Sequence, residues 1–277
     1  MVVSIALEGY GPLSVAAART TLGALSMLIL VALSRRRIPW RNGRLWGSVF
    51  PIGVLSTALP FFLLSWGQQY VPSAFAGLTM AALPLFVLPL AHFYSDEPLS
   101  NRKLVGVILG FVGAAVLLGP GIFSSTSGDF GALARFACLG AAFSYAVSSV
   151  LTRNCPPVDP TVLSAMSLGV GSMILLPVMF LVEGTPDWQV DRSGIAIIFL
   201  GVFPTAMATL LRIRVIQSAG SVFLTLVNYQ VPLWSMVFGA LVLQEVLPLR
   251  FFLALALILL GVAISQWNSL KRMLVKE

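Results

Sequence analysis

Few side chains in this sequence could bind a small molecule, and most of those few stand inside long apolar segments. Four prolines in mid-segment each leave the carbonyl four residues earlier without its usual N–H donor. The carbonyls freed in this way belong to Met80, Asn228, Ser56 and Leu200, ahead of Pro84, Pro232, Pro60 and Pro204. Within a bilayer such carbonyls need protein, water or a bound molecule as partner. The prolines therefore indicate either kinks that aid packing or points at which a substrate binds.

A row of small and polar residues follows one face of the segment Val222–Leu243. Its members recur at steps of four and three: Ser221, Thr225, Asn228, Pro232, Ser235 and Gly239. Such a stripe either permits close helix packing or faces an aqueous cavity. We expect the cavity for Thr225, Asn228 and Ser235, because a polar row is otherwise hard to keep in a bilayer.

Two tyrosines, Tyr145 and Tyr229, stand near the middle of apolar segments, and Ser144 and Ser148 share the helix of Tyr145. A phenol in hydrocarbon needs a hydrogen-bond partner. These side chains are expected either to bond internally or to line a cavity whose rings contact an aromatic or apolar substrate.

Arg19 is the one basic residue that could reach such a cavity. It lies seven residues past Pro12, roughly 10 Å along a helix. A charge at the bilayer centre costs about 2.5–3.5 kcal/mol or more. Arg19 therefore either snorkels to the outer surface or faces the cavity mouth, where it could attract a carboxylate.

Several kinds of chemistry are missing from the apolar segments. No Asp or Glu lies in mid-segment, and no nucleotide-binding loop or metal-binding spacing is present, while His92, Cys138 and Cys155 are expected to be structural. We therefore expect no catalytic residue, no metal and no cofactor. Transport by such a chain would be a facilitated process without ion coupling.

The composition identifies the elements that must position these residues. Hydrophobic residues make up 58% and charged residues 10% of 277, with a mean hydropathy of +0.94, which predicts an all-α integral membrane protein. Nine spans are expected: Leu13–Leu33, Leu45–Trp66, Ala74–Tyr94, Leu104–Gly119, Ala132–Thr152, Thr161–Val182, Ile195–Leu211, Val222–Leu243 and Phe251–Trp267.

The net charge of +7 is explained by topology rather than by nucleic-acid binding. The basic residues gather in short connections that we place on one side, among them the cluster Arg35–Arg44, Arg153, the pair Arg212 and Arg214, and the C-terminal tail. By the positive-inside rule this side and the C-terminus are cytoplasmic, in a multi-pass protein of the inner (plasma) membrane.

The chain also repeats itself at an offset of 148 residues. Pro84 and Glu97 recur as Pro232 and Glu245, and further matches include Pro12 with Pro160, Gly23 with Gly171, and Thr57-Ala58 with Thr205-Ala206. We interpret residues 1–123 and 131–277 as two tandem units joined by a linker at 124–130. A complete unit would have five spans, and most of a first span is expected to be missing. An odd span count makes the units inverted, as in secondary transporters.

At these residues the sequence resembles the drug/metabolite transporter superfamily, specifically its EamA-type ten-helix exporters. The resemblance covers the two units, the prolines Pro84 and Pro232, and the glutamates Glu97 and Glu245, together with Arg19 and fifth-helix glycines. It implies export of small metabolites through a central cavity formed by the first four helices of each unit. The sequence is similar to the family's aromatic amino-acid exporters, which are the preferred specific interpretation. Ser144-Tyr145 departs from the family, which often has a tryptophan there.

The candidate substrate-binding residues are thus Arg19, Ser56, Met80, Pro84, Ser144, Tyr145, Ser148, Thr225, Asn228, Tyr229 and Pro232. The partners expected are a small-molecule substrate and the lipid bilayer, not nucleic acid, with the chain a monomer or weak homodimer. A rival interpretation is a nucleotide-sugar or phosphorylated-metabolite carrier, which needs several basic groups in the cavity. An intramembrane enzyme and a structural or assembly protein are the alternatives of other classes.

Overall fold

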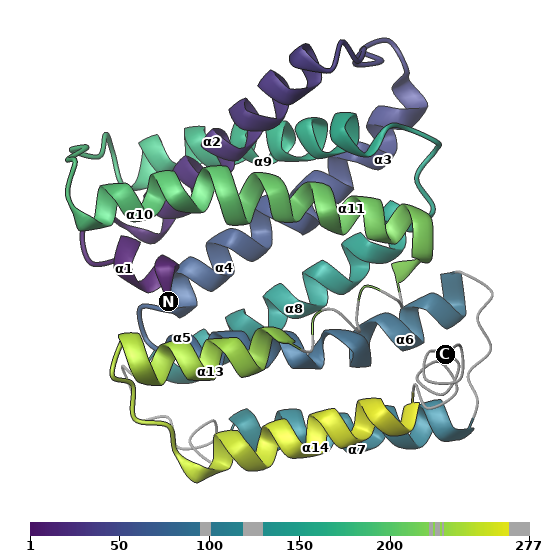
Figure 1. Ribbon diagram of the computed structural model, residues 1–277, viewed down its shortest axis with the longest axis vertical. Helices are drawn as coiled ribbons and strands as arrows, with labels where there is room; N and C mark the ends of the chain where they lie inside the picture. Colours follow the sequence, from purple (N-terminus) through teal and green to yellow (C-terminus); the bar gives the residue numbers. More distant parts are fainter. Residues whose placement is uncertain (95–100, 119–129, 222–223, 225–227, 229, 266–277) are drawn as a thin grey trace.

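The computed structural model describes residues 1–94, 101–118, 130–221, 224, 228 and 230–265, and within these the chain is helical (Figure 1). Six helical stretches are long and apolar enough to cross a membrane: Pro12–Leu33, Gly43–Gly67, Ser73–Tyr94, Gly131–Arg153, Pro160–Val182 and Arg192–Ala219. Shorter apolar helices cover Leu104–Leu117, Val231–Val242 and Leu249–Gly261. The chain is therefore a multi-pass membrane protein. Six of the nine expected spans reach the full length in the described residues.

The first half of the chain forms the following elements: α1 (Val2–Ala6), α2 (Pro12–Leu33), α3 (Gly43–Gly53), η1 (Val54–Ala58), α4 (Leu59–Gly67), α5 (Ser73–Thr79), η2 (Met80–Ala82), α6 (Leu83–Tyr94) and α7 (Asn101–Leu118). The second half forms α8 (Gly131–Arg153), α9 (Pro160–Val182), α10 (Arg192–Leu200), η4 (Gly201–Met207), α11 (Ala208–Ala219), α13 (Gln230–Val242) and α14 (Leu249–Ser265).

The helices begin where the sequence supplies an N-terminal signal. Pro12 and Pro160 occupy the first position of α2 and α9, where a missing N–H has no cost. The Asp159 carboxylate accepts from the N–H groups of Thr161 and Val162, and Asp191 accepts from Gly194 at the start of α10. These caps satisfy donors that a helix leaves unpaired.

Three of the long helices change pitch in mid-span, each near a proline. The stretch from α3 to α4 is π-helical over η1, ahead of Pro60, and the stretch from α10 to α11 is π-helical over η4, which contains Pro204. The stretch from α5 to α6 tightens to a 3₁₀ turn over η2, ahead of Pro84. A proline breaks the regular ladder, and the chain accommodates the lost hydrogen bond by a local change of pitch.

The helices pack in pairs that join the two halves of the sequence. Helix α2 lies against α9, and α7 lies against α14 along the lower edge of Figure 1. Glycines allow close approaches between helices, since a Cβ on Gly23 would stand 2.9 Å from Thr205 Cγ2, and one on Gly171 would overlap Thr57 Oγ1. Gly23 and Gly171 are 148 residues apart, as are Thr57 and Thr205. Small residues thus bring backbones together as they do in other membrane proteins.

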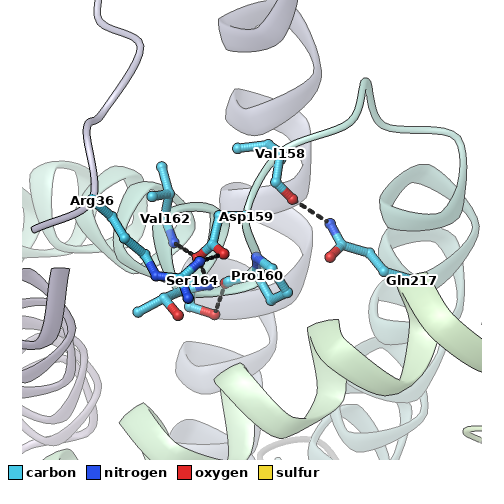
Figure 2. A network of polar contacts seen from close by, with 8 residues as sticks. Arg36, Val158, Asp159, Pro160, Val162, Ser164 and Gln217 are labelled. Atoms are coloured by element: carbon cyan, nitrogen blue, oxygen red, sulfur yellow. Dashed lines mark hydrogen bonds and ion pairs between the residues drawn. The ribbon is translucent and has the colours of Figure 1, made fainter. Parts of the chain in front are cut away.

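Charged side chains fasten the ends of these helices to one another. Arg36, just past α2, forms an ion pair with Asp159 at the start of α9, and beside it Gln217 Nε2 donates to the Val158 carbonyl at 3.2 Å (Figure 2). At the opposite end of α9, the Glu183 carboxylate accepts from Leu13 N and Ser14 N, both at 2.8 Å. Polar contacts therefore join α2 and α9 at both ends.

A second carboxylate makes the same kind of contact elsewhere. Glu245, past the end of α13, accepts from Ser73 N at 2.7 Å and Ala74 N at 3.0 Å, at the N-terminus of α5. A carboxylate at this position is stabilised by the unpaired N–H groups and by the helix dipole. Glu97, its counterpart at the 148-residue offset, lies outside the described residues.

Candidate functional site

A cavity of about 190 Å³ lies where the three pitch changes meet. Ser56 comes from η1, Met80 from η2 and Pro204 from η4. The remaining lining residues are Arg19, Phe61, Leu83, Tyr145, Ala208, Thr209, Arg212, Asn228 and Val231. Irregular backbone at membrane depth is tolerated where it is buried in protein or lines a cavity. The three irregular turns therefore line one cavity.

Arg19 of α2 is buried in this cavity, with 8% of its surface exposed. Its Nε donates to Thr205 Oγ1 at 3.1 Å, and its guanidinium carbon lies 4.0 Å from the centroid of the Phe61 ring. The two contacts orient the side chain, which does not snorkel to the surface. Among the described residues its two Nη groups have no hydrogen-bond partner, and they remain available to a ligand.

Arg212 is a second cation in the same cavity. Its Nη2 donates to Ser148 Oγ at 2.6 Å, to Ser149 Oγ at 2.9 Å and to the Tyr145 carbonyl at 3.1 Å. Its guanidinium carbon lies 5.3 Å from the centroid of the Tyr145 ring. The placement of Arg212 in a loop on the basic side is wrong, because α11 continues to Ala219 and carries Arg212 inside the helical stretch.

The cavity is positively charged. Its described lining contains two arginines and neither Asp nor Glu. No cluster of His, Cys, Asp and Glu that could hold a metal occurs in the part of the chain that the structure describes. Guanidinium groups bind carboxylate and phosphate oxygens in a planar, directed geometry. The arrangement can thus hold an anionic group beside two aromatic rings.

The candidates from the sequence are distributed around this cavity in two layers. Arg19, Ser56, Met80, Tyr145 and Asn228 line it. Ser148 lies behind it and positions Arg212, while Ser144 Oγ donates at 2.8 Å to the Leu55 carbonyl, within the π-helical turn.

The other candidates stand apart from the lining. Pro84 and Pro232 are buried and do not line the cavity. Thr225 and Tyr229 lie outside the described residues. The expectation that Ser235 faces the cavity is wrong, because Ser235 packs against Gly77 of α5, where an added Cβ would overlap it.

Seven lining residues were missed from the sequence: Phe61, Leu83, Pro204, Ala208, Thr209, Arg212 and Val231. The repeat contained a signal for some of them. Met80 and Asn228 are 148 residues apart, and the same offset relates Ser56 to Pro204, Phe61 to Thr209, and Leu83 to Val231. Extending each candidate to its partner in the other unit would have found one of the seven, Pro204, from Ser56.

The comparisons with known proteins agree with this architecture. A model described as the EamA-like transporter family matches residues 1–119 and 132–267. An uncharacterized transporter of Archaeoglobus fulgidus is 28% identical over 268 residues, which cover 95% of this chain and 91% of that protein. A solved crystal structure with a TM-score of 0.70 and 18% identity covers 96% of this chain and 91% of its own, and shows a shared fold.

Two further relatives are named for their substrates. A probable terminal-alkyne amino-acid exporter of Streptantibioticus cattleyicolor is 23% identical, covering 98% of this chain and 89% of that protein. A riboflavin transporter of Vibrio cholerae is 28% identical, covering 74% and 67%. Because the family model spans nearly all of the chain, this protein belongs to the EamA-like transporter family.

Proposed function

We propose that this chain exports small organic metabolites through the central cavity, and that amino acids, aromatic ones included, are the first substrates to test. The observation that carries the proposal is the pairing of guanidinium groups with aromatic rings at the meeting point of three interrupted helices. Guanidinium groups suit a substrate carboxylate, and the rings of Phe61 and Tyr145 suit an apolar side chain. The relative named as an amino-acid exporter supports the same class.

The mechanism proposed is alternating access of two inverted repeats of five spans, residues 1–123 and 131–277, joined by residues 124–130. Support comes from the lining, where Ser56, Phe61, Met80 and Leu83 have partners 148 residues later that line the same cavity. Support also comes from the packing, since the contact of Gly23 with Thr205 has a counterpart, at the 148-residue offset, in the contact of Gly171 with Thr57. Binding at the interface of two repeats, near broken helices, is typical of secondary transporters.

In the proposed movement, polar contacts at the helix ends hold one end of the protein or the other closed. At one end Arg36 pairs with Asp159, and at the other Glu183 and Glu245 bond to the N-termini of α2 and α5. Each contact joins residues from different halves of the chain. Rocking one repeat against the other would open one end while the contacts at the other end persist.

The proposal places the protein in the plasma membrane as a monomer or weak homodimer, with its basic side and C-terminus in the cytoplasm. It acts as a facilitator, because the cavity lining described here offers no carboxylate that could carry a proton or sodium ion. A cell that overproduces a metabolite supplies the gradient for export.

A phosphorylated-metabolite carrier, nucleotide sugars included, is the second candidate function. Arg212 favours it, because this candidate requires more than one basic group in the cavity and Arg212 joins Arg19 there. The two candidates differ in the anionic group that the arginines would hold.

Uptake of labelled amino acids, phosphorylated sugars and riboflavin into liposomes that contain the pure protein tests the proposal. We expect saturable flux of amino acids, absent from empty liposomes. Met80→Trp should abolish it by filling the cavity, whereas Leu25→Trp, at a residue of α2 that is 51% exposed, should retain it. Both variants are to be compared only if they stay monodisperse. Flux of phosphorylated sugars alone would select the second candidate, and no flux of any solute would refute transport through this cavity.

A further inference from the structure

We infer that the cavity selects net-anionic substrates, and in particular organic dianions, over zwitterions of the same size. The inference rests on the proposed transport function and narrows it to a charge class. It starts from the charge of the described lining, which contains Arg19 and Arg212 and no carboxylate.

Within the described residues, both guanidinium groups keep donors free for a ligand. Arg19 uses Nε for Thr205, which leaves its Nη1 and Nη2, and Arg212 uses Nη2 for its three acceptors, which leaves its Nε and Nη1. Within the described residues no other hydrogen bond is made by these atoms. An unsatisfied, desolvated cation is costly, so the favoured occupant carries a negative charge for each guanidinium.

The described lining offers a substrate ammonium no full negative charge. An ammonium is bound most strongly by a carboxylate or by the face of an aromatic ring, and more weakly by carbonyl and hydroxyl oxygens. The described lining supplies no carboxylate, and the two rings that could serve, Phe61 and Tyr145, each have a guanidinium over them, at 4.0 and 5.3 Å from the ring centroid. An amino acid in its zwitterionic form would therefore bring its positive charge beside two others.

The two cations are held by different elements, which makes a two-point site. Arg19 is fixed on α2 through Thr205 of η4, and Arg212 is fixed on α11 through Ser148 and Ser149 of α8. A substrate with two anionic groups can meet both arginines at once. A monoanion meets one and leaves the other without a counter-charge.

Three probes that share a phenyl ring and one carboxylate test this inference: L-phenylalanine, 3-phenylpropionate and benzylmalonate. They differ only in the second substituent, which is an ammonium, a hydrogen or a carboxylate. Binding is measured by thermal stabilisation of the purified full chain, with a smaller series of alanine, propionate and methylmalonate and with inorganic phosphate beside it. We expect the affinity to rise from zwitterion to monoanion to dianion in at least one series.

Variants then assign the effect to the two arginines. Arg19→Gln and Arg212→Gln should each weaken dianion binding at least about tenfold, while the monoanion should lose as much in only one of them. Arg214→Gln is the matched control, because Arg214 stands on the same helix, is exposed and does not line the cavity. If Arg212→Gln does not fold, Arg212→Lys and Arg19→Gln carry the comparison.

The results separate this inference from the transport proposal. Flux of L-phenylalanine that equals or exceeds that of benzylmalonate, and is unchanged in both arginine variants, would overturn the inference and leave export intact. Absence of binding by every anion in the panel would overturn it as well. Absence of flux for every solute in the liposome uptake assay would refute transport itself.

Discussion

Replacing Gly171 by alanine tests the packing that holds the π-helical turn η1 at the cavity. Gly171 of α9 faces this turn, and an added Cβ would overlap Thr57 Oγ1 and stand 3.0 Å from Thr20 Cγ2. Both threonines are fully buried. The Thr57 hydroxyl donates to the Gly53 carbonyl at 2.6 Å, so that turning it aside would break a hydrogen bond.

The size of the effect follows from two opposing contributions. Overpacking a tightly filled contact costs about 1–3 kcal/mol. Alanine in a helix interior recovers about 0.5–1 kcal/mol relative to glycine. We therefore expect Gly171→Ala to lower the free energy of unfolding by about 1–2 kcal/mol.

Thermal unfolding of the purified protein in detergent is the assay, with Gly169→Ala as the matched control. Gly169 lies on the same helix two residues earlier, and nothing stands within 4 Å of its added Cβ. This variant should be as stable as the parent or slightly more stable. Thr57→Ala in the Gly171→Ala background should restore part of the loss, because it removes the hydroxyl that the new methyl meets. Equal unfolding temperatures for the two alanine variants would refute the packing argument.

Three further results are expected. Glu245→Gln should lower the free energy of unfolding by about 1 kcal/mol because it removes a carboxylate from the N-terminus of α5, whereas Glu8→Gln, at an exposed residue, should leave the unfolding temperature unchanged. Flux into proteoliposomes should follow the substrate gradient and respond little to an imposed pH or sodium gradient, and uphill accumulation driven by either ion would contradict the facilitator mechanism. Partial burial raises the pKa of the Cys155 thiol, so a maleimide should label it slowly at pH 7 and faster as the pH rises; labelling at pH 7 as fast as that of an exposed cysteine would contradict the raised pKa.

The sequence was sufficient to predict the helical membrane class and several positions of the cavity. Mid-span prolines predicted unpaired carbonyls, and the structure has changes of pitch at η1, η2 and η4, which meet at one cavity. A proline acts on its own helix, through a hydrogen bond four residues away. Local chemistry of this kind can be read without knowing which helices are neighbours.

The roles of Arg212 and Ser235 could not be obtained in this way. Arg212 was placed with the loop arginines because it follows an apolar run, yet its position is fixed by Ser148 and Ser149 on another helix. Ser235 belongs to the same polar stripe as Asn228, which lines the cavity. Ser235 itself packs against Gly77 of α5. Both cases depend on contacts between helices far apart in the sequence, for which helical periodicity gives no information.

The two arginines also differ from the rest of the cavity in their relation to the repeat. Ser56, Phe61, Met80 and Leu83 have partners in the lining at the 148-residue offset, whereas Arg19 corresponds to Ser167 and Arg212 to Leu64. The lining residues that have repeat partners are thus uncharged, and neither arginine has an arginine at the corresponding position of the other unit. One arginine comes from each unit. Under the proposed mechanism the two units move against each other. The affinity for a substrate that binds both arginines would then depend on the relative position of the units, whereas the contact with a single arginine would not.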